Sequence, residues 1–319
     1  VNNEEMLAES INAAKRESLS AFGSEEIFLE KYIKSPRHIE FQVAGDKHGN
    51  YIHLFERECS IQRRHQKIIE ETPSVALDDE LRTKMGKTAV EVVKAAGYDN
   101  IGTVEFLLDD DKNFYFLEVN ARLQVEHPIT EETTGVDLVK LQFDIANGLE
   151  IAYKQEDLKQ SNHSIECRIY AEDSENNFMP SPGKISFYNE PNIKGARFDS
   201  GIVSGSLVPI YYDPILSKLI VTDENREKAI EKMLEVLKNY PVLGVVNTIE
   251  FLIECLNHSE FKAGNTKTDF IEKNNIKVNK NPDYLNMALA TATYFNKNIE
   301  KTATELENIG SWEICSSKY

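Results

Sequence analysis

The sequence predicts an α+β fold whose character changes about halfway along the chain. Residues 38–44 alternate apolar and polar side chains and precede a turn and a second strand at 51–56, which is typical of a hairpin. Residues 103–108 and 113–119 flank a short acidic loop and predict a second hairpin. Beyond about Tyr153, short strands separated by Pro- and Gly-bearing turns indicate a second, β-rich part with packed helices.

The first part also contains three helical patterns. Residues 4–21 have apolar side chains at helical spacing, and residues 27–33 follow as a short strand-like stretch. The helix predicted at 78–96 begins with an Asp cap and is stopped by Gly97. A helix at 137–146 is ended by Gly148.

In the second part we expect strands at 163–170, 183–188, 195–199 and 219–222, and helices at 226–240 and 248–256. The chain is polar after Asn279, with one helical pattern at 284–294. These changes predict three segments, with boundaries at 1–155, 156–275 and 276–319, the last being a tail or the start of a further domain.

Composition excludes several classes of protein. The formal net charge of -17 argues against a nucleic-acid surface. No apolar run approaches the ~20 residues of a membrane helix. The four cysteines are scattered without metal-type spacing, so we expect reduced thiols in an intracellular protein. Cytoplasm is the expected compartment, and a mitochondrial matrix location stays open because the sequence begins at Val1.

The second hairpin brings two glutamates together. With a four-residue loop, Glu105 faces Phe116 across the hairpin. Thr103 then faces Glu118, so the two glutamates are diagonal neighbours with β-carbons ~7 Å apart. Asn120 shares their face, and such oxygen ligands suit Mg²⁺ or Mn²⁺ beside a polyphosphate. A solvated hairpin face is an equally good explanation.

A basic segment follows the first hairpin. Six consecutive residues combine three cations, a titratable ring and two amides: Gln62, Arg63, Arg64, His65, Gln66 and Lys67. Such a loop can hold phosphate oxygens or a small carboxylate-like anion. Charge alone favours the alternative, a solubilising loop paired with Glu70 and Glu71.

The stretch "FLEVNARLQVEHP" runs from an apolar strand into a polar cluster. Arg122 supplies a forked donor for a planar anion. Glu126 has the chemistry of a general base. We interpret His127 as a structural turn residue.

Arg168 lies on the polar side of the strand at 163–170. A cation on a strand face is most often part of an ion pair, here with Glu166 or Glu172.

Taken together, these stretches resemble biotin carboxylase, an enzyme of the ATP-grasp superfamily. The matching strings, in the family's order, are "EKYIKSPRHIEFQV", "ERECSIQRRHQKIIEE", "GTVEFLL", "FLEVNARLQVEHPITEETTGVDLV", "ECRIYAED", "PSPGKI" and "YYDPILSKLIV". They extend to about Lys273, and "RRHQK" and "QVEHP" are the most specific. The resemblance implies the C-terminal part of an ATP-grasp domain, including part of its lid domain, followed by a β-rich biotin carboxylase C-terminal domain.

The branch of the family is also indicated. "SGIVSGSLVPIYYDPILSKL" and "AGNTKTDFI" look most like the biotin-dependent acyl-CoA carboxylases. Pyruvate carboxylases usually have Thr where this chain has Pro128.

The resemblance assigns roles to matching positions. The metal ligands that hold Mg-ATP match Glu105, Glu118 and Asn120. Nucleotide-binding positions match Glu30, Lys31, Ile33, His38, Gln62, His65, Gln66 and Leu107. The bicarbonate pocket matches Lys67, Arg122, Gln124 and the backbone of Val125. Glu126 matches the base that deprotonates bicarbonate, and Arg168 matches the arginine that steadies the biotin enolate.

The implied reaction has two stages. Bicarbonate, oriented by Lys67 and Arg122 and deprotonated by Glu126, attacks the γ-phosphate of Mg-ATP. The carboxyphosphate breaks down to CO₂ and phosphate, and biotin is carboxylated while Arg168 offsets the oxyanion charge. No "MKM" attachment signature is present, so the biotin carrier and the carboxyltransferase are expected outside this chain. Family members are usually homodimers.

The sequence also departs from the family. Complete members have an amino-terminal α/β domain and a glycine-rich lid before the position that matches Val1, and no Gly-rich phosphate loop occurs in this sequence. We therefore expect little or no carboxylation by this polypeptide alone. Two alternatives stay open: another ATP-grasp carboxylate ligase, such as a carbamoyl phosphate synthetase relative, and a non-catalytic assembly or dimerisation module.

Overall fold

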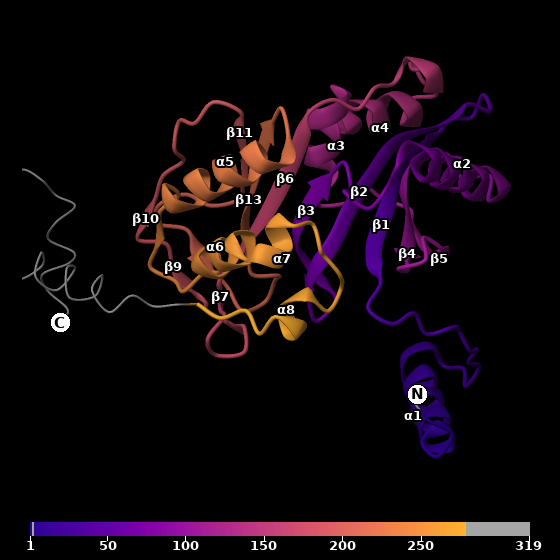
Figure 1. Cartoon of the computed structure of the whole chain (residues 1–319), viewed down its shortest axis with the longest axis horizontal. Helices are drawn as coiled ribbons and strands as arrows, with labels where there is room; N and C mark the ends of the chain where they lie inside the picture. The colour runs from indigo at the N-terminus through magenta and orange to yellow at the C-terminus, as the bar shows by residue number, and fades with distance from the viewer. Residues whose placement is uncertain (2, 279–319) are drawn as a thin grey trace, which may run out of the picture.

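A large antiparallel sheet forms the centre of the computed structural model, which describes residue 1 and residues 3–278 (Figure 1). In this part of the chain, eight strands are hydrogen-bonded in the order β11-β13-β6-β3-β2-β1-β4-β5. Their bounds are β1 (Arg37–Gly45), β2 (Tyr51–Arg63), β3 (Gln66–Thr72), β4 (Asn100–Leu108), β5 (Phe114–Asn120), β6 (His163–Tyr170), β11 (Ala196–Ser200) and β13 (Ile215–Asp223).

Short strand pairs extend the second half. They are β7 (Glu172–Asp173) with β8 (Met179–Pro180), β9 (Gly183–Lys184) with β12 (Leu207–Val208), and β10 (Phe187–Tyr188) with β14 (Val242–Leu243). The predicted strand at 183–188 was wrong as a single element, because β9 and β10 pair with different partners.

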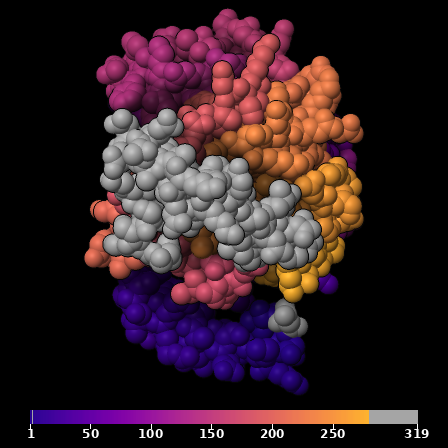
Figure 2. Space-filling view, turned by 90° about the vertical axis from the view of Figure 1, so that its left-hand side faces the viewer, coloured from indigo at the N-terminus to yellow at the C-terminus, as the bar shows by residue number. Residues whose placement is uncertain are grey.

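Helices cover the sheet and lie at both ends of the molecule. They are α1 (Leu7–Phe22), α2 (Asp79–Ala95), α3 (His127–Thr134), α4 (Leu138–Ala146), one short turn (Gln155–Asp157), α5 (Arg226–Lys238), α6 (Ile249–Asn257), α7 (Ser259–Lys262) and α8 (Phe270–Lys273). Figure 2 shows the N-terminal segment (indigo) at one end and the region of α3 and α4 (magenta) at the other. None of the described helices is both long and apolar enough to cross a bilayer.

Side-chain caps define the starts of helices α2 and α4, of which the Asp cap of α2 was predicted. The Asp78 side chain accepts a hydrogen bond from the Leu81 amide at the start of α2. Asp137 does the same with the Lys140 amide at the start of α4. Helix α3 was not predicted. It begins at His127, contains Pro128 in its first turn, and ends at Gly135 with φ +73°.

Other expectations for the chain ends need correction or lie outside the described residues. The predicted strand at 27–33 was wrong, because this segment forms no strand in the described part of the chain. Helix α1 buries none of its side chains. The helical pattern at 284–294, Cys315 and most of the predicted tail lie outside the described residues. Cys59, Cys167 and Cys255 are buried free thiols, as expected.

The sheet is continuous across residue 155, because β3 pairs with β6. Ile69 is opposite Cys167, and Glu70 is opposite Glu166. One apolar cluster likewise joins Ile69 of β3 to β6 and to helices α5 and α6. The domain boundaries named above stay predictions.

The hairpin of β4 and β5 has a different register from the predicted one. Glu105 is directly opposite Glu118, and Thr103 is opposite Asn120. An irregularity between Glu105 and Phe106 shifts the pairing, because one strand carries an extra residue at that point. The two glutamates therefore face one another and are not diagonal neighbours.

The basic segment is not a loop. Strand β2 continues to Arg63, and β3 begins at Gln66. Arg64 and His65 form the turn between them, with φ of 49° and 65°. Gln62 and Lys67 are therefore cross-strand partners on two long strands, which holds their side chains over the sheet.

Candidate active site

One face of β1 is apolar and the other carries the candidate site. Ile39, Phe41 and Val43 pack in a core cluster with helix α2. The alternating polar side chains His38 and Glu40 are buried on the opposite face, where they have polar partners. The strand alternation seen in the sequence thus separates a structural face from a functional one.

Lys67 is the hub of this polar face. Its Nζ lies 2.5 Å from Glu40 Oε2, 2.9 Å from Glu105 Oε1 and 2.6 Å from Glu126 Oε1. Burial disfavours the ammonium, but Glu40 and its neighbours outweigh this effect and raise the pKa of Lys67. Three carboxyl groups, from β1, β4 and the start of α3, are thereby held around one cation on β3.

Two of these carboxyl groups are strongly held as anions. Burial would raise the pKa of Glu40, but Lys67 and Arg57 lower it to about 2. Burial likewise opposes the charge of Glu105, and hydrogen bonds from His38 and Lys67 lower its pKa well below the ordinary value. Both carboxylates are therefore ionised at neutral pH.

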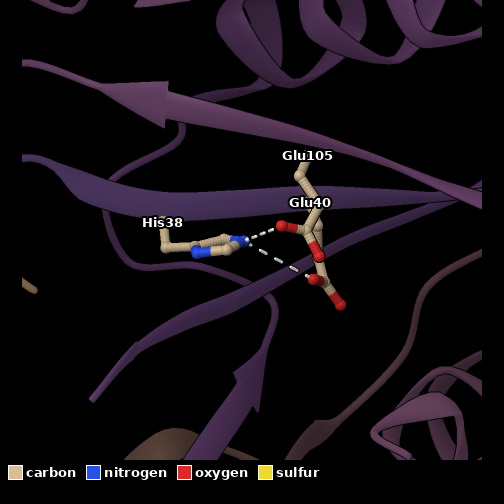
Figure 3. A group of neighbouring side chains, drawn as sticks. All are labelled: His38, Glu40 and Glu105. Carbon is tan, nitrogen blue, oxygen red and sulfur yellow. Dashed lines mark ion pairs between the residues drawn. The ribbon is translucent and has the colours of Figure 1, made fainter. Parts of the chain in front are cut away.

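Figure 3 shows His38 pointing toward Glu105 and Glu40. His38 Nε2 is 3.0 Å from Glu105 Oε2 and 3.7 Å from Glu40 Oε2. The Gln62 amide nitrogen fixes the ring from the other side, 2.9 Å from His38 Nδ1. This trio has the donor atoms of a metal site. The Glu40 carboxylate is already bound by both Lys67 and Arg57, so we assign no metal to this trio.

Arg57 is fully buried beneath this cluster. It donates to five side-chain oxygens, those of Glu40, Gln42, Thr103, Gln124 and Thr130, over 2.6–3.2 Å. The Gln124 amide in turn donates to Glu105 Oε1 at 2.8 Å. Arg57 therefore connects strand β1 to the loop that precedes α3.

Arg168 binds Glu126 from the side opposite Lys67. Its Nη2 is 2.9 Å from Glu126 Oε2, and its Nε is 2.6 Å from Glu70 Oε1. Each oxygen of Glu126 therefore accepts from a different cation. The expected pairing of Arg168 with Glu166 or Glu172 was wrong. Glu172 is bound by Arg63, and Glu166 accepts no hydrogen bond from any described residue.

The alternative explanation of the basic segment was also wrong. Glu70 binds Arg168, and Glu71 binds His163 and Arg226. Glu70 and Glu71, the acids nearest to the basic segment in sequence, bind other residues because β3 places them beside β6. Strand β6 follows almost a hundred residues later in the chain.

The proposed metal ligands lie together at the end of the β4–β5 hairpin. Asn120 Nδ2 is 3.1 Å from Glu105 Oε1 and 3.0 Å from Glu118 Oε1, so both carboxylates converge on one amide. A half-turn of that amide exchanges its nitrogen for its oxygen at nearly the same position. Two carboxylates and an amide oxygen are the donors that Mg²⁺ or Mn²⁺ prefers, so these residues fit such an ion.

The remaining bicarbonate positions differ in their surroundings. Gln124 is buried, whereas Arg122 is exposed and donates to Asn120 Oδ1 at 3.4 Å and to the Leu123 carbonyl at 3.3 Å. The Val125 carbonyl accepts from Lys218 Nζ at 2.9 Å. The roles of Arg122 and Val125 stay predictions.

The nucleotide positions are divided between the site and its margin. Leu107 is opposite His38 on β4, close to Glu105. Gln66 accepts from Arg63, and His65 is exposed at the β2–β3 turn.

The nucleotide positions Glu30, Lys31 and Ile33 lie outside the sheet. Glu30 is exposed, and Ile33 is buried. Lys31 Nζ donates to Tyr115 Oη at 2.8 Å, a bond that raises the pKa of Lys31. His127 bonds the Gln124 carbonyl through Nδ1 at 2.7 Å, which suits a structural turn residue.

Three central residues were missed by sequence reasoning. Glu40 could have been found, because its strand alternation places it beside His38. Arg57 and Glu70 carried no local signal, because every partner of their side chains is distant in sequence.

Comparison with known proteins gives two family matches. Residues 1–154 match the model for the ATP binding domain of the carbamoyl-phosphate synthase L chain. Residues 166–273 match the model for the biotin carboxylase C-terminal domain.

Curated relatives are longer than this chain. Biotin carboxylase 2 of Bacillus subtilis (strain 168) is 47% identical over 273 residues, which is 86% of this chain and 61% of that protein. The mitochondrial propionyl-CoA carboxylase alpha chain of Mus musculus is 48% identical over 271 residues, which is 84% of this chain and 37% of that protein. The chain thus spans about three fifths or less of these relatives.

Solved structures agree with the sequence matches. A complex of Campylobacter jejuni biotin carboxylase with β-γ-ATP has a TM-score of 0.82 at 44% identity, covering 85% of this chain and 60% of that one. The biotin carboxylase domain dimer of Hydrogenobacter thermophilus 2-oxoglutarate carboxylase, in complex with MgADP, ADP and bicarbonate, has a TM-score of 0.81 at 45% identity, covering 85% and 60%.

Proposed function

Because the chain belongs to the biotin carboxylase family of ATP-grasp proteins, we propose that the protein containing it carboxylates biotin with ATP and bicarbonate. This reaction is the first half-reaction of a biotin-dependent carboxylase. The proposal extends from this chain to a longer protein, since the chain covers 61% of the Bacillus subtilis relative.

One observation carries the proposal: Glu126 is held between Lys67 and Arg168. Both oxygens of this carboxylate accept from cations, so the group is oriented as a base. When Glu126 takes a proton from bicarbonate, its negative charge is lost. The N–H groups of Lys67 and Arg168 that bound Glu126 can then attract the negative charge that develops on the reacting groups.

Glu105, Glu118 and Asn120 would hold Mg²⁺ or Mn²⁺, which offsets the charge of the ATP phosphates. Gln124 is fixed by Arg57, so its amide is positioned without any ligand. Arg122 is exposed close to Asn120 and would bind bicarbonate from the open side of the site. Arg168 would face biotin once Glu126 is neutral.

We assign the protein to the acyl-CoA carboxylase branch, with a biotin carboxyl carrier, a carboxyltransferase and a second copy of this chain as partners. The named relatives support the branch, because propionyl-CoA and methylcrotonoyl-CoA carboxylase subunits are 45–48% identical. The Hydrogenobacter thermophilus domain is a dimer by its description, which supports a homodimer. The acyl acceptor and a cytoplasmic location stay predictions.

The test is bicarbonate-dependent ADP release with free biotin, measured on the isolated protein that contains this chain. Glu126→Gln should lose about 10²-fold or more of the turnover, because the base is removed while the shape is kept. Glu150→Gln, at an exposed position outside the site, is the matched control. Equal turnover in the Glu126→Gln variant would overturn the proposed role.

The same assay separates the alternatives. Turnover that does not depend on biotin would favour another carboxylate ligase. Undetectable binding of Mg-ATP would favour a non-catalytic assembly module. Robust turnover by the 319-residue chain alone would contradict the expectation that this polypeptide is inactive by itself.

A further inference from the structure

Two buried glutamates face each other beside Arg168. Glu70 on β3 and Glu166 on β6 are cross-strand partners, and each is 0% exposed. Side chains at directly opposed positions of antiparallel strands have β-carbons about 4.5–5.5 Å apart. The sheet therefore brings two carboxyl groups together away from water.

Their hydrogen bonds do not account for two anions. Glu70 Oε1 accepts from Arg168, but Glu70 Oε2 and both oxygens of Glu166 have no hydrogen-bond partner among the described residues. A buried ionised carboxylate without donors is strongly disfavoured. A proton on one of the two groups supplies the missing donor and removes one of the two charges.

The charges around the site point the same way. Five carboxyl groups are buried within one connected region: Glu40, Glu70, Glu105, Glu126 and Glu166. The cations that bind them are Lys67, Arg57 and Arg168. Acids thus outnumber these cations by two, and one shared proton reduces the excess.

Neighbouring elements offer little further compensation. On β13, Lys218 is opposite Arg168 and its charge opposes the raised pKa of Glu166, but burial and the charge of Glu70 outweigh it, and its amine binds Asp199 and the Val125 carbonyl. Helix α3 also packs against β6. Its titratable groups bind elsewhere: Glu131 and Glu132 bind Arg197, and His127 binds the Gln124 carbonyl. The opposite face of β6 is apolar and packs against α5.

We propose that Glu70 and Glu166 share one proton, and that this singly charged pair positions Arg168 against Glu126. With one charge on the pair, the guanidinium bridges Glu70 and Glu126, as observed. With two charges, the pair would draw Arg168 away from Glu126. Glu70 and Glu166 are thus positioning residues, and their relevance to biotin rests on the function proposed above.

The shared proton predicts the direction in which folding stability changes with pH. Burial and the charge of Glu70 raise the pKa of Glu166 well above its ordinary value, and burial raises the pKa of Glu70 to about 7. The folded state then binds more protons than the unfolded state above the ordinary carboxyl pKa of about 4.3. Stability contributed by the pair is therefore lost as pH rises.

The experiment measures melting temperature from pH 5 to pH 9 on the isolated protein. Glu166→Gln places a permanent neutral isostere in the pair, so its melting temperature should rise relative to wild type as pH increases. Glu71→Gln is the matched control at the adjacent position. Bonds from His163 and Arg226, working against burial, lower the pKa of Glu71 to about 2, so this variant should melt lower than wild type at every pH above 5.

A constant deficit of Glu166→Gln at all pH values, or a deficit that grows with pH, would overturn the inference, because both imply that Glu166 acts as an anion. Infrared spectra give a second test: wild type should show a protonated-carboxyl band at neutral pH that Glu166→Gln lacks. Neither readout needs catalysis. Absence of biotin carboxylation in the wild-type protein, with its pH-dependent stability as expected, would reject the proposed function and leave the shared proton in place.

Discussion

Lys67 Nζ lies 2.6 Å from Glu126 Oε1, although 59 positions separate the two residues. The same ammonium also binds Glu40 and Glu105, so removing it leaves three buried carboxylates without their shared cation. The pairing joins the β2–β3 hairpin to the start of α3 and is the structural centre of the candidate site.

The first prediction concerns this ammonium. Lys67→Met should lower the free energy of unfolding by about 3–5 kcal/mol, because uncompensated charges remain buried. Urea denaturation measures the change. Lys47→Met is the control, since Lys47 is exposed and its amine is 4.0 Å from Asp99; it should change stability by less than about 1 kcal/mol. Equal effects of the two variants would show that the Lys67 cluster contributes little.

The second prediction concerns Arg57, whose five acceptors need a planar fork. Arg57→Lys keeps the charge but leaves several buried acceptors unbound, so we expect a loss of about 3 kcal/mol or more. The matched variant is Arg64→Lys at the exposed turn, where a change within about 0.5 kcal/mol is expected. A tolerated Arg57→Lys would contradict the need for the fork.

The third prediction is loss of stability in acid. Glu40 and Glu71 have pKa values of about 2, held down by Lys67 and Arg57 at Glu40 and by His163 and Arg226 at Glu71, against the effect of burial. Because these values are depressed, each carboxylate contributes stability that is present above the ordinary pKa and disappears as pH falls toward 2. Each contribution is on the order of 3 kcal/mol.

Thermal melts between pH 5 and pH 2.5 measure this loss. In Glu71→Gln the slope of stability against pH should be shallower over this range, because one of the titrating groups is gone. An unchanged slope in that variant would assign the acid sensitivity to other carboxylates.

The fourth prediction concerns the divalent cation. Mn²⁺ should bind in the presence of ADP, and Glu118→Gln should weaken its binding about tenfold or more, because a charged oxygen ligand is lost. Electron paramagnetic resonance of free Mn²⁺ measures the affinity. Asp111→Asn removes the same charge from the exposed tip of this hairpin and should leave the affinity unchanged. A similar loss in both variants would indicate a general effect of negative charge.

Much of the fold could be predicted because its signals are local. Asp78 caps its helix through a residue three positions away, and the β1 alternation separates its two faces within nine residues. The roles assigned by resemblance also depend on short strings. Of these residues, the structure brings together Lys67, Glu105, Gln124, Glu126 and Arg168.

Local sequence pattern did not predict the position of a side chain where strand register or a partner distant in sequence determines it. The irregularity between Glu105 and Phe106 places Glu118 directly opposite Glu105, and no feature of the strand sequence reveals the extra residue. The turn leaves His65 exposed, and its nucleotide role, which the resemblance implies, stays a prediction.

The sequence by itself determined most of the longer helices and strands, the apolar face of β1, and which family's motifs the chain carries. Only the tertiary structure decided that Arg57 underlies the site, that Arg168 binds Glu70 and Glu126, and that Glu70 meets Glu166. The physical reason is that caps and strand faces depend on neighbours a few residues away. A buried charge instead takes its partners from whichever strands the sheet order places beside it.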